Sequence, residues 1–116
     1  MSDGSRTSFR VFAIPRKAYV RDDIDFPGPV VIEGKVMGDI RCMSLVVAEG
    51  GAVDGMIKAD TVTVLGEVSG VIFATHLTLK TSSAVAADIC HKHLSLEDGC
   101  FFEGRSRSHK NPLLLV

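Results

Sequence analysis

The sequence predicts an all-β protein whose folded part is a parallel β-helix, or β-solenoid, of about five to six short coils. Composition is the first observation: 14 Val and 7 Ile stand against one Tyr and no Trp, which suits strands packed on small, regular side chains. Periodicity is the second, because the central part repeats every 15 to 17 residues and apolar residues alternate within each repeat as in strands. Length is the third, since 116 residues allow one compact domain with tails.

Each repeat contains the pattern Val-x-Gly-x-Ile, with Ala in place of Gly once, followed by two alternating aliphatic residues. The four repeats are VMGDIRCMSLVV (36–47), VDGMIKADTVTV (53–64), VSGVIFATHLTL (68–79) and VAADICHKHLSL (85–96), and residues 102–105 open a fifth. Helical repeats are usually longer than this period. If each repeat is one coil, equivalent side chains stack about 4.8 Å apart inside the helix. The predicted interior columns are Ile40, Ile57, Ile72 and Ile89, and Leu45, Val62, Leu77 and Leu94.

A small residue recurs at the same place of every repeat, at Gly38, Gly55, Gly70, Ala87 and Gly104. We expect glycine there to relieve crowding at a bend between strands. Ala87 adds one methyl group, which we expect the bend to tolerate at a small cost in stability.

Two tails flank the repeats in this interpretation. Residues 1–29 are polar, mixed in charge and interrupted by Pro15, Pro27 and Pro29, so we expect a flexible N-terminal tail. The β-helix domain is predicted over residues 30–104. Residues 105–116 carry basic but no acidic side chains before a short apolar end, which predicts a flexible C-terminal tail.

Charge and cysteine content indicate the compartment and exclude some partners. The net charge is −1, which gives no electrostatic reason to expect nucleic acid as a partner. Cys42, Cys90 and Cys100 are odd in number and lack paired spacing, which favours a reducing compartment, the cytoplasm. No apolar run is long enough for a signal-peptide core or a membrane-spanning helix, so we expect no export.

Three segments together resemble the bactofilins, a family of bacterial polymer-forming cytoskeletal proteins: IEGKVMGDI (32–40), VDGMIKA (53–59) and EDGCFFEG (97–104). The resemblance covers about residues 22–105. It implies a right-handed, roughly triangular β-helix that polymerises end to end without nucleotide. It also implies a scaffolding role in cell shape or for envelope-synthesis proteins. Ala87 and His91 depart from the small residues usual in this family, so the fourth coil is expected to be locally distorted.

Polymerisation also follows from the fold, because a β-helix without caps leaves backbone groups and apolar interior exposed at both terminal coils. The predicted interface consists of Phe101 and Phe102 at the last coil and Val30 and Val31 at the first. Phe102 occupies the inward register of the repeat, and Phe101 the adjacent outer position. The alternative is that Phe102 closes its own coil and the C-terminal tail covers it.

The N-terminal segment is a candidate for peripheral membrane contact. Phe9, Arg10, Val11 and Phe12 combine apolar and basic side chains, which suits an anionic surface such as the inner face of the cytoplasmic membrane. The alternatives are a plain spacer or a docking segment for a partner protein.

Enzyme motifs are missing from the sequence: it has no Gly-x-Ser-x-Gly, no phosphate-binding Gly-x-x-x-x-Gly-Lys and no His-Glu-x-x-His. We therefore expect a protein that is not an enzyme, with no catalytic residue and no cofactor. His76 and His93 occupy the same place in successive repeats, but no compact Cys/His spacing accompanies them, so we predict no metal site. The alternative function is a discrete oligomeric β-helix of the ligand-binding or acyltransferase-like type.

Overall fold

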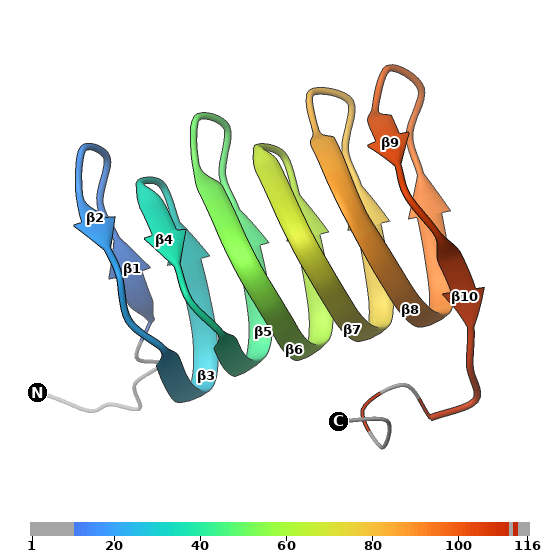
Figure 1. Ribbon diagram of the computed structural model, residues 1–116, viewed down its shortest axis with the longest axis horizontal. Helices are drawn as coiled ribbons and strands as arrows, with labels where there is room; N and C mark the ends of the chain where they lie inside the picture. The colour runs from blue at the N-terminus through green and yellow to red at the C-terminus, as the bar shows by residue number, and fades with distance from the viewer. Residues whose placement is uncertain (1–10, 112, 114–116) are drawn as a thin grey trace, which may run out of the picture.

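The computed structural model describes residues 11–111 and 113, and these residues form ten strands and no α-helix. All strand pairs are parallel, and each coil lies on the previous one along a single axis (Figure 1). The predicted class, an all-β parallel solenoid of about six coils, is therefore confirmed. The strands are β1 (Phe12–Ile14), β2 (Tyr19–Val20), β3 (Ile24–Ile32), β4 (Lys35–Met37), β5 (Ile40–Val47), β6 (Ala52–Val64), β7 (Glu67–Leu79), β8 (Ala84–Leu96), β9 (Phe101–Glu103) and β10 (Ser106–Ser108).

Each coil crosses three faces of the solenoid, which we name A, B and C in chain order. A strand residue on a face lies in register with the equivalent residue of the coils before and after it. Face A contains residues 12–14, 29–32, 44–47, 61–64, 76–79 and 93–96. Face B contains residues 19–20, 35–37, 52–54, 67–69, 84–86 and 101–103. Face C contains residues 24–26, 40–42, 57–59, 72–74, 89–91 and 106–108.

The core is a set of aliphatic columns that run along the axis. Strand alternation turns every second side chain inward, and parallel in-register pairing places identical positions of successive coils above one another. On face C, Ile40, Ile57, Ile72 and Ile89 lie in one column, all 2% exposed or less. On face A, Leu45, Val62, Leu77 and Leu94 form a second column, in which the first three are buried and Leu94 is half-buried because it belongs to the last coil.

The recurring small residues lie at the corner between faces B and C. Gly38, Gly55, Gly70 and Gly104 have positive φ angles between 120° and 155°. A Cβ atom on Gly70 would lie 2.2 Å from the carbonyl oxygen of Gly55, so the corner has no room for a side chain. Ala87 is in register with Gly70, but within the described residues only Lys17 among non-glycines has positive φ. The backbone of this coil therefore turns the corner in a different conformation, which agrees with the expected local distortion.

The predicted boundaries of the β-helix were too narrow at both ends. β1 pairs with β3, β2 pairs with β4, and β10 pairs with β8, so the solenoid extends from Phe12 to Ser108. Residues 11–29 are thus not a tail, and Ile14 and Ile24 are buried in the core. The first coil was not recognised from the sequence because its prolines indicated a break in the strands. In the structure, β3 accommodates these prolines through a register shift between Phe26 and Pro29. Residues 1–10, the rest of the predicted tail, lie outside the described residues.

The longer turns between faces A and B also stack on one another. The Nζ of Lys80 lies 3.0 Å from Oε2 of Glu97 one coil later, and the Thr81 hydroxyl donates a hydrogen bond to the same carboxylate. The hydrogen bond and charge of Lys80 lower the pKa of Glu97.

No helix among the described residues is long and apolar enough to cross a membrane.

Candidate polymerisation surfaces

The two terminal coils have open backbone edges. In the strand order of the sheet, β1 stands at one end and β10 at the other, so among the described residues neither has a partner on its outer side (Figure 1). β2 and β9 are likewise the outermost strands of face B. A strand edge of this kind is a template for pairing with another chain.

At the N-terminal end, two aromatic side chains cover the interior. The rings of Phe12 and Phe26 lie 5.6 Å apart between centroids and are tilted by 50°. Phe12 remains 39% exposed and Phe26 half-buried because no further coil of residues 11–111 covers them. Val11, which precedes β1, and Tyr19, in β2 of the same coil, are also exposed, at 52% and 56%. The first coil thus ends in an apolar surface that a second molecule could cover.

The predicted interface residues Val30 and Val31 do not belong to this end. Val30 pairs with Phe12 on one side and with Leu45 on the other, and it is only 1% exposed. This prediction was wrong because it placed the first coil at residue 30, one coil too late. The equivalent residues of the true terminal coil are Phe12 and Ala13.

At the C-terminal end, the interior side chains of faces A and B are apolar and incompletely covered. Leu94 is half-buried and Leu96 is 52% exposed. Phe102 lies in register with Val85, is half-buried and packs against the core. Phe101 lies in register with Ala84, points outward on face B and is 58% exposed. Phe102 therefore faces the end of the solenoid, and Phe101 borders it.

At the same end, the side chains of face C are polar. Ser106 and Ser108 lie over Ile89 and His91 in the last coil. His91 is buried in the column that holds Ala59 and Ala74 in earlier coils, a placement that the sequence pattern marked only as a departure. Its Nε2 lies 2.7 Å from the Ser106 hydroxyl, whereas its Nδ1 is buried without a hydrogen-bond partner. Burial lowers the pKa of His91, so the neutral ring is favoured.

Two further groups of side chains are candidate sites: the pair of histidines on face A and the thiol of Cys42. The rings of His76 and His93 stack on face A, with centroids 4.8 Å apart and an interplanar angle of 12°. Parallel rings do not direct two nitrogens at one ion, and the described part of the chain contains no group of three or more potential metal ligands. Burial raises the pKa of the Cys42 thiol to about 11, which makes it a poor nucleophile at neutral pH.

The chain is thus a parallel solenoid whose two terminal coils leave strand edges open and apolar side chains partly exposed, a fold class of stacked repeats. A sequence model of the bactofilin family, described as polymer-forming cytoskeletal, matches residues 12–107. The chain therefore belongs to the bactofilin family, as the sequence resemblance predicted. The matched range nearly coincides with the solenoid from β1 to β10.

Two solved structures of bactofilins are similar to this chain. The solid-state NMR structure of the cytoskeletal bactofilin BacA has 34% sequence identity and a TM-score of 0.77, and the match covers 87% of this chain and 96% of BacA. The crystal structure of a phenylalanine-to-arginine mutant of the bactofilin from Thermus thermophilus has 25% identity and a TM-score of 0.70, covering 75% of this chain and 98% of the other. No curated protein sequence matches the chain. Membership of a polymer-forming family implies self-association and a structural, non-enzymatic role.

Proposed function

We propose that this chain assembles end to end, without nucleotide, into cytoskeletal filaments. The observation that carries the proposal is the incomplete burial of inward-facing apolar side chains in both terminal coils. These are Phe12 and Phe26 at one end and Leu94, Leu96 and Phe102 at the other. A docked molecule would continue the stack at the usual spacing of about 4.8 Å, pair the open strand edges and remove these side chains from water.

Assembly would be governed by concentration, because no phosphate-binding motif is present that could couple it to nucleotide hydrolysis. Such a filament would repeat the same lateral surfaces along its length, which suits a scaffold for proteins of cell shape or envelope synthesis. The family's description as polymer-forming cytoskeletal supports this role.

The proposal is tested by placing a charge at the C-terminal end. Phe102→Arg would carry an unpaired guanidinium into the end contact, so soluble, folded short species are expected. Leu96→Arg tests the same surface at a side chain that is already exposed, with less risk to folding. Met43→Arg is the control for this end, because Met43 is 61% exposed and lies between the second and third of the six coils, away from the C-terminal end.

Negative-stain microscopy, sedimentation velocity and circular dichroism would measure filaments, size and folding together. Filaments from the parent and Met43→Arg, with folded short species from the other two variants, are expected. Unchanged filaments from Phe102→Arg would remove Phe102 from the interface. A parent protein that stays a discrete trimer at all concentrations would favour the ligand-binding or acyltransferase-like alternative.

We also propose a peripheral contact with the inner face of the cytoplasmic membrane through the segment around Phe9 to Phe12. Val11 and Phe12 are exposed at the N-terminal end, while Phe9 and Arg10 lie outside the described residues. Apolar and basic side chains together would supply the two signals that stable peripheral binding requires. Because β1 begins at Phe12, deletion of residues 2–10 leaves the solenoid intact. Co-sedimentation with anionic liposomes should fall on this deletion, and equal pelleting of both proteins would end the membrane proposal.

A further inference from the structure

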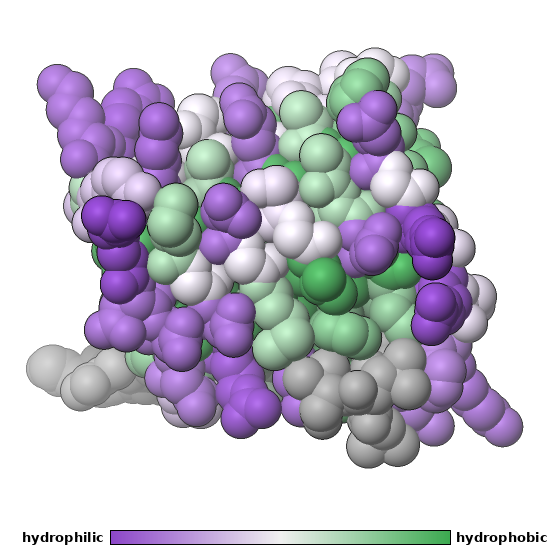
Figure 2. All heavy atoms as spheres, viewed as in Figure 1, coloured by the Kyte–Doolittle hydropathy of each residue, from purple (hydrophilic) through white to green (hydrophobic). Residues whose placement is uncertain are grey.

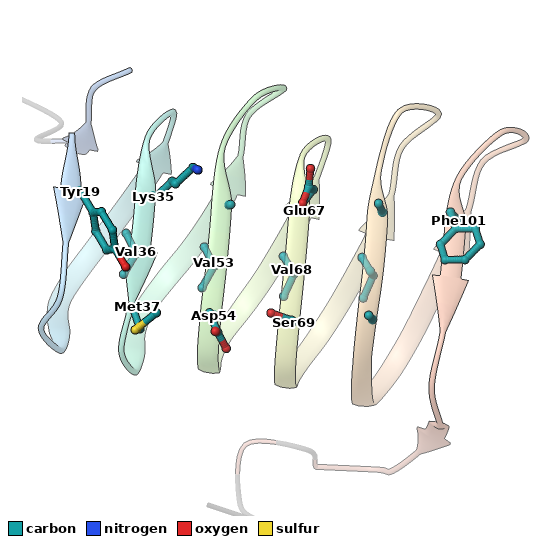
Figure 3. A pocket seen from close by; sticks show the side chains of 14 residues that line it. Tyr19, Lys35, Val36, Met37, Val53, Asp54, Glu67, Val68, Ser69 and Phe101 are labelled. Atoms are coloured by element: carbon teal, nitrogen blue, oxygen red, sulfur yellow. The ribbon is translucent and has the colours of Figure 1, made fainter. Parts of the chain in front are cut away.

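A shallow groove of about 260 Å³ runs along face B. Its floor consists of small outward side chains, among them Ala52, Ala84 and Ala86. Tyr19 and Phe101 stand at its two ends, in the first and last coils (Figure 3). Apolar and weakly polar side chains cover the middle of the front of the molecule, and hydrophilic side chains gather toward its edges (Figure 2). The groove thus spans the whole solenoid rather than one coil.

The outward side chains of face B form two columns, each with one residue from each coil. The guanidinium of Arg21, which follows β2, lies 5.8 Å from the centroid of the Tyr19 ring and so belongs to the same surface. The first column is Tyr19, Lys35, Ala52, Glu67, Ala84 and Phe101. The second is Arg21, Met37, Asp54, Ser69, Ala86 and Glu103.

We propose that face B is a lateral interface with a second copy of this chain, in which the two solenoids run antiparallel. The partner is related by a two-fold axis that is parallel to the strands and passes between the third and fourth coils. This operation sets the first coil against the sixth, the second against the fifth and the third against the fourth. The contact is isologous, so each pair of residues occurs twice. This inference rests on the proposed function, because the interface would join two filaments side by side.

The two columns are complementary to themselves under this operation. At each end, Tyr19 meets Phe101 and the guanidinium of Arg21 meets the carboxylate of Glu103. In the second and fifth coils, the long side chain of Met37 enters the depression over Ala86. In the two central coils Asp54 faces Ser69 and Ala52 faces Glu67, so like charges do not face each other directly, although the two Glu67 carboxylates lie one coil apart across the axis, as do those of Asp54.

Lys35 supplies the second ion pair. It faces Ala84 of the other copy, whose small side chain leaves the space beside it open. Glu67 of that copy lies in the same column one coil away, at about 4.8 Å, which the lysine side chain spans. Lys35 and Glu67 are both exposed within the single chain, so both are free to make this pair.

The parallel arrangement lacks this complementarity. A two-fold axis along the solenoid sets each coil against its own equivalent and exchanges the two columns. Phe101 would then face the carboxylate of Glu103, and Lys35 would face Met37, two coils from Glu67. In the parallel arrangement Lys35 would lie one coil from Asp54 of the other copy, but Arg21 would face Tyr19 and lie one coil from the like charge of Lys35. The direct pair of Arg21 with Glu103 forms only in the antiparallel arrangement, and electrostatic complementarity sets the orientation of an interface.

The size of the face decides when the contact forms. Six coils about 4.8 Å apart and three residues of about 3.3 Å each give face B dimensions of roughly 25 by 10 Å. The area of this face is far smaller than the area that each partner buries in a stable complex, which is about 800 Å². Single molecules should therefore not pair. Within filaments the contact repeats along the length, and multivalency makes the sum of weak contacts effective.

Charge reversal tests the inference without removing any apolar contact. In Lys35→Glu and in Glu67→Lys, like charges replace the ion pair, so filaments should persist but lose their lateral pairing. The double variant Lys35→Glu/Glu67→Lys restores opposite charges and should restore paired filaments. Lys58→Glu makes the same change of charge on face C and is the matched control, which should still pair.

Negative-stain microscopy separates the two levels of assembly, and high salt should also separate paired filaments. Pairing lost in each single variant and recovered in the double variant supports the antiparallel interface. Parent filaments that never pair, or a double variant that stays unpaired, would overturn it and leave the proposed filament standing. A parent that forms no filaments would overturn the proposed function and this inference with it.

Discussion

The most discriminating stability prediction concerns the corner glycine Gly70. In Gly70→Ala the new Cβ would lie 2.2 Å from the carbonyl oxygen of Gly55 and 2.9 Å from its carbonyl carbon. These are backbone atoms of the preceding coil, so no side-chain rotation can relieve the contact. The φ angle of Gly70 is also +120°, a conformation that alanine rarely adopts.

Two effects add in this variant. Holding a non-glycine residue in a strained backbone conformation costs about 1–3 kcal/mol, and forcing an extra carbon into a packed site costs a similar amount. Partial relaxation of the corner reduces the sum, so a loss of about 3 kcal/mol is expected. For a domain of this size that corresponds to a decrease of roughly 15 °C in melting temperature.

Thermal unfolding by circular dichroism measures this effect in a Phe102→Arg background, in which the proposed end contact is expected to be blocked and polymerisation should not add to stability. Ser69→Ala, a change at the exposed neighbour, controls for the substitution itself. Ala87→Gly is the reverse change at the corner that already contains a methyl group, and it should lower stability by about 1 kcal/mol or less. A melting temperature of Gly70→Ala equal to that of Ser69→Ala would refute the steric reasoning.

Two further predictions concern buried titratable groups. Because burial lowers the pKa of His91 from its ordinary value of 6.5, the unfolded chain binds a proton first, and the melting temperature should fall as the pH falls below 6.5. His91→Ala should weaken this pH dependence while His93→Ala, an exposed control, retains it, and equal profiles for the two variants would contradict the assignment. Because the pKa of Cys42 is raised to about 11, peptide mapping should show little alkylation of this thiol by iodoacetamide in the folded protein and full alkylation in denaturant. Equal rates in the two states would contradict the raised pKa of this half-buried thiol.

The interior of the central coils could be predicted from the amino-acid pattern. A parallel solenoid places residues one coil apart in direct contact, so the same side chain must recur at the same step, and the repeat is visible in the chain. Ile57 and Ile72 could be assigned to one column for this reason alone. The family resemblance and the corner glycines followed from the same periodicity.

Features that depend on the ends and on distant coils became visible once the three-dimensional arrangement of the coils was known. The first coil lacks the repeat, and within the described residues no coil lies on its outer side to match it, so Phe12 and Ile14 could not be recognised from the pattern. His91 looked like an outlier of the repeat, and only its position beneath the last coil shows a buried ring. The groove on face B joins Tyr19 and Phe101 from opposite ends of the chain, and the register of all six coils had to be known before they could be placed on one surface. Periodicity specifies neighbours, whereas the edges and faces of a solenoid are properties of the whole stack.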